Sequence, residues 1–219
     1  MAHGQTAVSL STASGRVSEM EAMLKKYTAN LPPPSIRNHT ENRKEVVLLT
    51  GSTGSLGCYL LADLITDPSI DRVYALNRTD IKGLRSVYIR QASAFKERDL
   101  DYSVLNSDKL QLLEADLGME YFGLEEEDVY EMMRREVTCI IHTGMFFWQE
   151  KMRSFMSLTA WPTDLITTLP SLEPLVAGTR RLVDFALSAR FSPQLMLISS
   201  LSIFSSKFIS SDLVGDTSD

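Results

Sequence analysis

The chain has 219 residues, of which 44% are hydrophobic and 23% charged, values typical of a soluble globular protein. Its formal net charge of −6 comes from scattered acidic residues, which argues against nucleic-acid binding. No apolar run reaches the roughly 18 residues of a membrane span, and the N-terminus lacks the pattern of a secretory signal, so we expect a cytoplasmic location. Cys58 and Cys139 lie in separate apolar runs, and we interpret them as buried free thiols rather than a disulfide.

The first 44 residues are predicted to form an appendage to a larger domain. Residues 1–15 are small and polar and are expected to be disordered. Residues 16–44 are expected to form a helix and a linker. The helix begins after Ser18, and its apolar residues recur at helical spacing. Three consecutive prolines at 32–34 end it, because proline cannot continue a helix.

From residue 45 onwards, predicted strands and helices alternate. Short apolar runs predict strands at 46–50, 72–77, 109–116, 138–143 and 194–200. The intervening patterns predict helices at 55–66, 81–100, 124–137 and 172–190. Almost continuously apolar strands separated by helices are typical of a parallel sheet covered on both faces. We therefore predict an α/β fold with a doubly wound, Rossmann-like parallel sheet.

A glycine-rich turn, "TGSTGSLG", follows the first predicted strand. Gly51 permits a tight exit from the strand, Gly54 lets the backbone approach a phosphate, and Gly57 lets the next helix pack against the sheet. The turn lacks the Lys-Ser/Thr ending of a nucleoside-triphosphate loop. The alternative is a tight turn without a ligand, but its place between a strand and an amphipathic helix favours a dinucleotide diphosphate. The predicted diphosphate-binding residues are Gly51, Thr53, Gly54, Ser55, Leu56 and Gly57.

The end of the second predicted strand indicates which coenzyme binds. NAD-type sites usually place an acidic residue there to hold the ribose 2′-hydroxyl group. This chain has Asn77 and then Arg78 instead. A guanidinium group suits a 2′-phosphate, so NADPH is favoured over NADH. The alternative for Arg78 is a solvated loop residue.

Residues 45 to about 205 resemble the thioester reductase domains of fungal adenylate-forming enzymes of the aminoadipate-reductase type, which are NRPS-like and belong to the extended short-chain dehydrogenase/reductase superfamily. The likeness rests on the glycine-rich turn, on "LLEADL" and "VTCIIHT", and on "LEPLVAGTRRLVDFA". The preceding helix and Pro-rich stretch are similar to the linker between a carrier domain and such a reductase. The resemblance implies NADPH-dependent reduction of an acyl thioester on a carrier protein, which releases an aldehyde or an alcohol. It implies no metal.

The resemblance also implies roles for further residues. Asp116 and Leu117 match the position that contacts the adenine, although Asp116 could equally cap the strand end. His142 and Thr143 match the strand end beside the nicotinamide, but a single histidine on an apolar strand is more often a core residue. Ser200 matches the catalytic Ser/Thr, whose hydroxyl group would bind the substrate carbonyl oxygen as charge develops. The alternative for Ser200 is a polar residue leaving the sheet.

Two departures from the family pattern bear on activity. The superfamily's catalytic Tyr-x-x-x-Lys does not occur after Ser200, so we expect residues 45–219 to form a C-terminally truncated, partial reductase domain. Residues 144–159 interrupt the family-like sequence, as either a retained intron or a real insertion that covers the cofactor. The enzyme interpretation therefore stands beside two alternatives, a non-catalytic NADP(H)-binding module and an inactive fragment. The sequence does not predict an oligomeric state.

Overall fold

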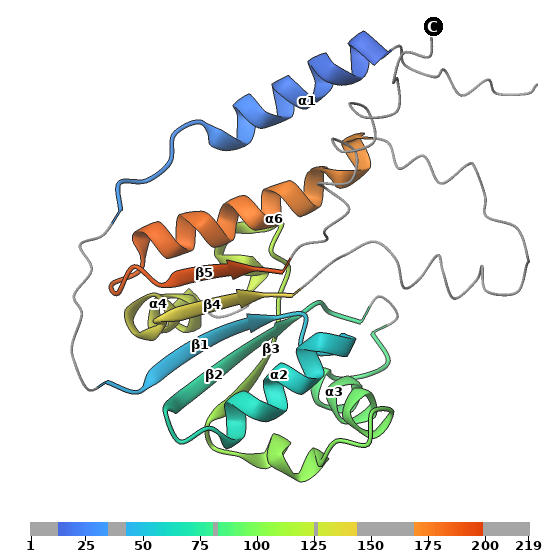
Figure 1. Cartoon of the computed structure of the whole chain (residues 1–219), viewed down its shortest axis with the longest axis vertical. Helices are drawn as coiled ribbons and strands as arrows, with labels where there is room; N and C mark the ends of the chain where they lie inside the picture. The colour runs from blue at the N-terminus through green and yellow to red at the C-terminus, as the bar shows by residue number, and fades with distance from the viewer. Residues whose placement is uncertain (1–12, 35–42, 81–82, 125–126, 144–168, 199–219) are drawn as a thin grey trace, which may run out of the picture.

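The computed structural model describes residues 13–34, 43–80, 83–124, 127–143 and 169–198. In this part of the chain, five strands form one parallel sheet in the order β3-β2-β1-β4-β5 (Figure 1). This is the doubly wound α/β fold that the sequence predicts. The strands are β1 (Glu45–Thr50), β2 (Ile70–Asn77), β3 (Leu110–Glu114), β4 (Cys139–His142) and β5 (Gln194–Leu197).

The strand pairing aligns the carboxyl ends of the central strands. Thr50, the last residue of β1, pairs with Leu76 of β2 and with His142 of β4. Asn77 at the end of β2 pairs with Glu114 at the end of β3. The loops that leave these strands therefore start from one edge of the sheet, where ligands of doubly wound folds bind.

Helices cover both faces of the sheet (Figure 1). On one face lie α2 (Ser55–Thr66) and α3 (Val87–Lys96), and on the other lie α4 (Glu127–Glu136) and α6 (Leu169–Ser188). Successive residues of β1 alternate between the faces, since Val46 and Leu48 join one core cluster and Val47 and Leu49 join the other. This explains why the strand is apolar at nearly every position.

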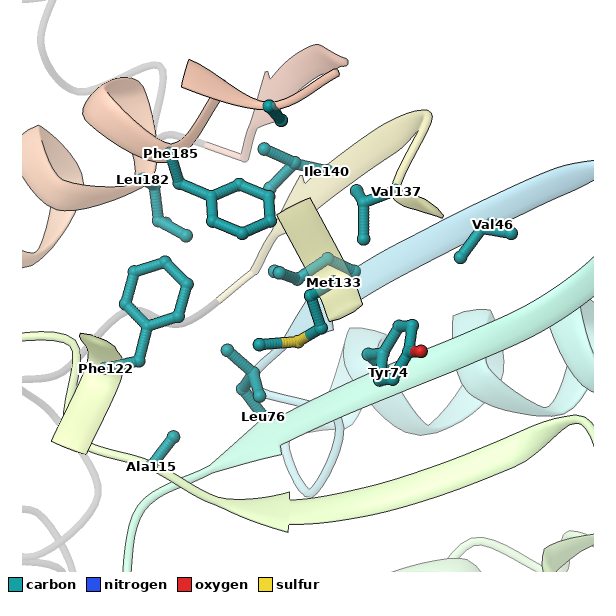
Figure 2. Close-up of a cluster of buried hydrophobic side chains, with 12 residues drawn as sticks. Val46, Tyr74, Leu76, Ala115, Phe122, Met133, Val137, Ile140, Leu182 and Phe185 are labelled. Carbon is teal, nitrogen blue, oxygen red and sulfur yellow. The ribbon is translucent and has the colours of Figure 1, made fainter. Parts of the chain in front are cut away.

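The core on the α4/α6 face is rich in aromatic and long apolar side chains. Figure 2 shows Phe185 and Leu182 of α6 and Met133 of α4 directed towards the strands, all with 0% exposure. The rings of Phe122 and Phe185 lie 5.5 Å apart, and Tyr130 packs edge-on against both. These contacts hold α4 and α6 on the sheet.

An N-terminal helix, α1 (Ala13–Thr28), lies alongside α6 (Figure 1). Lys26 Nζ and Tyr27 Oη both donate to Glu173 of α6, at 2.6 Å and 2.9 Å. The helix begins before Ser18, where the sequence pattern predicts its start, so residues 13–15 are helical although they were assigned to the disordered tail.

The other differences from the predicted elements occur at boundaries and in short turns. The helix predicted at 81–100 is shorter, because Gly83 has a φ of 62° and Ser86 caps α3 by accepting from the Ile89 N–H. Two 3₁₀ helices, η1 (Tyr102–Asn106) and η2 (Glu120–Gly123), were not predicted. Both cysteines are free thiols, as predicted, but only Cys58 is buried as expected, and Cys139 is half-buried. Among the described helices, none is both long and apolar enough to cross a bilayer.

Candidate functional site

The candidate site lies at the carboxyl edge of the sheet, next to the point where the strand order reverses. From β1 the chain continues to β2 and β3 on one side, and β4 then pairs on the other side of β1. This edge carries the residues predicted to bind the coenzyme, which follow four successive strand ends. They are the 51–57 turn after β1, Arg78 after β2, Asp116 after β3 and Thr143 after β4.

The glycine-rich turn is built as its sequence predicts. Gly51 has a φ of 77°, a conformation that disfavours other residues, and its carbonyl accepts from the Gly54 N–H at 2.9 Å. A Cβ atom at Gly57 would lie 2.2 Å from the Gly51 oxygen and 2.8 Å from the Ser52 Cα. Gly57 therefore lets α2 start directly against the turn.

The N-terminus of α2 offers unshielded backbone donors. Gly54 is its N-cap residue and has no side chain to accept from the first-turn amides. No acidic residue lies in this first turn, and Ser55 and Leu56 are exposed. A helix end of this kind attracts anions through free N–H groups and the helix dipole. The half-buried Thr53 precedes it within the turn.

Asn77 and Arg78 face different environments at the end of β2. Asn77 is 4% exposed, and its side chain hydrogen-bonds to Ser52 beneath the turn. Arg78 is exposed at the same sheet edge. The position that carries a ribose-binding acid in NAD-type sites is thus turned into the protein, while the guanidinium group that follows lies at the surface.

The residues after β3 form a compact turn. Asp116 is exposed, its Oδ1 accepts from the Gly118 N–H at 2.8 Å, and its own N–H donates to the Phe122 carbonyl. These bonds support the alternative that Asp116 stabilises the strand end, and its exposure leaves it accessible to a ligand. Leu117 packs against the α4/α6 core and touches α6, where a Cβ atom at Gly178 would lie 3.0 Å from it.

The ends of β1 and β4 are joined by side chains. Thr143 Oγ1 donates to the Thr50 carbonyl at 2.7 Å, which fastens the loop after β4 to the start of the glycine-rich turn. His142 is 9% exposed, and its Nδ1 lies 2.5 Å from Thr50 Oγ1. Burial lowers the pKa of His142, so its imidazole is neutral near pH 7. These contacts support the interpretation of His142 as a core residue.

Sequence reasoning missed two residues that structure the site, Ser52 and Gln91. Both are 0% exposed, and they hydrogen-bond to each other beneath the glycine-rich turn. The available signal was a polar residue at a buried position of α3, because Gln91 lies on the same side of the helix as the buried Ala94 and Phe95.

Two predicted features cannot be placed. Ser200 and the 144–159 segment both lie outside the described residues. In the described part of the chain, no three His, Cys, Asp or Glu residues cluster in a way that could hold a metal ion.

A parallel sheet with a glycine-rich first turn, an uncapped helix start and a reversal of strand order defines a dinucleotide-binding domain of the doubly wound class. Residues 49–212 match the sequence family described as male sterility protein, an NAD-binding family. The chain therefore belongs to this family, and the resemblance inferred from its motifs is confirmed.

Its similar relatives are fungal adenylate-forming reductases. The chain is 42% identical over 193 residues to adenylate-forming reductase Nps9 of Serpula lacrymans var. lacrymans, which covers 84% of this chain and 16% of that protein. It is 28% identical over 183 residues to a carboxylic acid reductase of Neurospora crassa, covering 83% of this chain and 15% of that protein. The chain thus spans about a sixth of the length of these relatives.

Solved structures with a similar fold include reductase domains. The terminal R domain of the myxalamid PKS-NRPS pathway aligns with a TM-score of 0.56 and 23% identity, covering 85% of this chain and 42% of that one. The PhqB reductase domain of Penicillium fellutanum aligns with a TM-score of 0.55 and 21% identity, covering 84% and 42%. At these identities the likeness supports the fold.

Proposed function

We propose that this chain is the coenzyme-binding part of an NADPH-dependent reductase that acts on acyl thioesters held by a carrier protein. The observation that carries the proposal is the 51–57 turn, where free first-turn amides of α2 lie at the same sheet edge as the exposed Arg78. The relatives, which are adenylate-forming and carboxylic acid reductases, support the reaction class.

The described residues fit two groups in the adenosine half of NADP(H), the diphosphate and the 2′-phosphate. The amides of the turn and the hydroxyl groups of Thr53 and Ser55 would hold the diphosphate, and Arg78 would hold the 2′-phosphate through charge-assisted hydrogen bonds. Asp116 and Leu117 would flank the adenine, and Thr143 would lie on the nicotinamide side. No acidic residue stands in the first turn of α2 to repel the diphosphate.

When bound, NADPH supplies the hydride that converts a thioester carbonyl group into an aldehyde with release of the thiol. The role assigned to Ser200 is to donate a hydrogen bond to the carbonyl oxygen, where negative charge develops. His142 is held neutral by burial and is bonded to Thr50, so its role here is to fix the ends of β1 and β4.

A titration of the purified chain with NADPH and with NADH tests the coenzyme assignment. We expect NADPH to bind more tightly, and Arg78→Ala to weaken NADPH binding by about 10- to 100-fold, because a hydrogen bond to a charged group contributes about 1.5–3 kcal/mol. NADH binding should stay unchanged. Arg85→Ala, which removes another exposed arginine from the same β2–α3 connection, is the matched control. An unchanged NADPH preference in Arg78→Ala would contradict the assignment.

A second candidate function is an NADP(H)-binding module without chemistry. It is supported by the predicted site residues that the structure describes, all of which are coenzyme-binding candidates, while the predicted catalytic Ser200 lies outside the described residues. Incubation with NADPH and an acyl-pantetheine thioester separates the two. Consumption of NADPH with stoichiometric aldehyde or alcohol indicates the reductase, and binding without consumption indicates the module.

A further inference from the structure

Three polar side chains are buried together directly beneath the glycine-rich turn. Ser52 and Gln91 are 0% exposed and Asn77 is 4% exposed, and they come from the turn, from α3 and from the end of β2. Their neighbours on this face of the sheet form an apolar cluster. Buried polar groups are stable only where they are hydrogen-bonded, so we call these three residues the Ser52 network and consider its bonds one by one.

The shorter hydrogen bonds form one consistent set, in which the single Ser52 Oγ proton goes to Gln91 and not to Asn77 Oδ1 at 3.1 Å. Cys58 Sγ also donates to the Ser52 carbonyl, at 3.2 Å. Ser52 Oγ donates to Gln91 Oε1 at 2.7 Å and accepts from Asn77 Nδ2 at 2.8 Å. Gln91 Nε2 donates to the Ser52 carbonyl at 2.9 Å. Turning the Gln91 amide over would set its oxygen against the Ser52 carbonyl oxygen, which fixes its orientation. Gln91 therefore holds Ser52 by both its hydroxyl group and its carbonyl group.

The two hydrogen bonds between Gln91 and Ser52 fix the direction of a backbone amide in the predicted diphosphate site. The Ser52 carbonyl and the Thr53 N–H belong to one planar trans peptide unit, so they point in opposite directions. Because the carbonyl points inward to the buried Gln91, the Thr53 N–H points away from the core. The preceding residue, Gly51, has a φ of 77° and is a position where the chain can turn easily. An anchor at Ser52 restricts that freedom.

The same helix also reaches the strand ends on the ribose and adenine side. Arg90, next to Gln91, donates to Glu114 at the end of β3 at 3.0 Å, and the guanidinium group is mostly buried. Asn77, at the end of β2, is held in the network by Ser52 and the Ala75 carbonyl and is 4% exposed. Through Gln91 and Arg90, α3 thus contacts the turn after β1 and the carboxyl end of β3.

We infer that Gln91 is a positioning residue for the nicotinamide-dinucleotide site: without touching the coenzyme, it holds the peptide unit between Ser52 and Thr53 in the orientation that presents the turn's amide to a diphosphate. The inference rests on the proposed function for the identity of the ligand. It also implies that Asn77 serves the turn and not the ribose.

Gln91→Met tests the inference, because methionine retains the length of the side chain and removes both hydrogen bonds to Ser52. In the ligand-free full chain, we expect exchange of the Gly54 N–H, which donates to the Gly51 carbonyl, to become about tenfold faster, and NADPH to bind about tenfold more weakly, since one lost bond of about 1.4 kcal/mol is a factor of ten. Ser52→Ala removes only the hydroxyl group, so its effects should be smaller. This milder variant also tests the network should Gln91→Met fail to fold.

Phe95→Leu is the matched control, because Phe95 is a 0% exposed residue of the same helix that takes no part in the Ser52 network. It should lower the thermal midpoint while leaving exchange of the Gly54 N–H and NADPH affinity unchanged below that midpoint. The inference would be overturned if Gln91→Met and Ser52→Ala both kept the wild-type exchange rate in the turn. It would also be overturned if Phe95→Leu changed that rate as much as they do. If the wild-type chain bound neither NADPH nor NADH, the proposed function would fail, and the exchange measurement would still decide whether Gln91 holds the turn.

Discussion

Gly57 is a position where the site and the fold both depend on the absence of a side chain. A Cβ atom there would lie 2.2 Å from the Gly51 oxygen and 2.8 Å from the Gly51 carbon, both backbone atoms that cannot move without opening the turn. We therefore expect Gly57→Ala to lower the free energy of unfolding by about 3 kcal/mol or more, as in severe overpacking. Urea denaturation measures this change.

Gly54→Ala provides the comparison within the same turn. Its backbone has an ordinary φ of −75°, and a Cβ atom there would meet only the Gly51 oxygen, at 3.1 Å. The free energy of unfolding should change by less than about 1 kcal/mol. Equal destabilisation by the two substitutions would show that the close approach at Gly57 does not determine the turn.

His142 predicts a pH dependence of stability. Burial lowers its pKa in the folded chain, whereas the unfolded chain has the ordinary value of about 6.5. As the pH falls below that value, the unfolded chain takes up a proton that the folded chain resists. The free energy of unfolding should then decrease, by up to about 1.4 kcal/mol per pH unit for one proton.

The control for this effect is His142→Gln, which keeps a polar group near Thr50 and cannot titrate. Denaturation between pH 7.5 and pH 5.5 should show a steeper loss of stability in the wild type than in this variant. Parallel pH profiles would contradict a neutral, buried His142. The comparison within one pair of proteins removes the contribution of the carboxylates, which are the same in both.

At the residue scale, sequence predicts the site where local spacing determines it and fails where distant side chains pair. The three glycines are recognisable because each meets a local requirement for a tight turn or a close approach, and Arg78 is predicted from its place directly after the second strand. The bond between Ser52 and Gln91 joins residues 39 positions apart, and no local pattern encodes it. The sequence shows that Asn77 stands in place of an acid, but its burial against Ser52 depends on the folded turn and is not encoded locally.

At the element scale, periodicity predicts the strands and helices well, and their ends less well. The helix from Ser55 to Thr66 has its predicted limits, and its start is well defined because a glycine turn precedes it. The predicted 81–100 helix is shortened, since Asp80 accepts from the N–H groups of Leu84 and Arg85 and forms a turn there. The two 3₁₀ helices are too short to show a period.

Arg180 of α6 binds the C-terminal end of α1. The Arg180 guanidinium group donates to the carbonyl oxygens of Tyr27, Ala29 and Asn30, at 2.9, 2.7 and 3.0 Å, and to Asp184 at 2.8 Å. It therefore supplies partners for carbonyl groups at the C-terminal end of α1.

We expect Arg180→Lys to release α1, because an ammonium group keeps the charge but cannot form this fork of bonds. Hydrogen exchange within residues 17–28 should become about tenfold faster, since bonds to a charged group contribute at least 1.4 kcal/mol, or about a factor of ten, while exchange in the sheet stays unchanged. Arg135→Lys, on the exposed surface of α4, is the control. Unchanged exchange in α1 would show that its other contacts, such as those of Lys26 and Tyr27 with Glu173, suffice.

At the scale of the whole molecule, one sheet is shared by two cores. The Val46 and Leu48 side chains belong to the α4/α6 core, shown in Figure 2, and those of Val47 and Leu49 belong to the α2/α3 core. β1 lies at the centre of the described sheet, between β2 and β4. A substitution that destabilises the packing on one face is therefore expected to destabilise β1 and, through its adjacent residues, the packing on the other face.

This arrangement predicts that both faces unfold together. Phe95→Ala on the α2/α3 face and Phe185→Ala on the α4/α6 face each remove a ring with 0% exposure, and each should cost about 3–5 kcal/mol. In both variants, denaturant-dependent hydrogen exchange should show α2 and α6 losing protection at one shared midpoint, lower than in the wild type. Leu84→Ala, at a side chain with 77% exposure, should leave the midpoint unchanged. Separate midpoints for α2 and α6 would mean that the faces are independent, and the turn at 51–57 would then depend on the α2/α3 face alone.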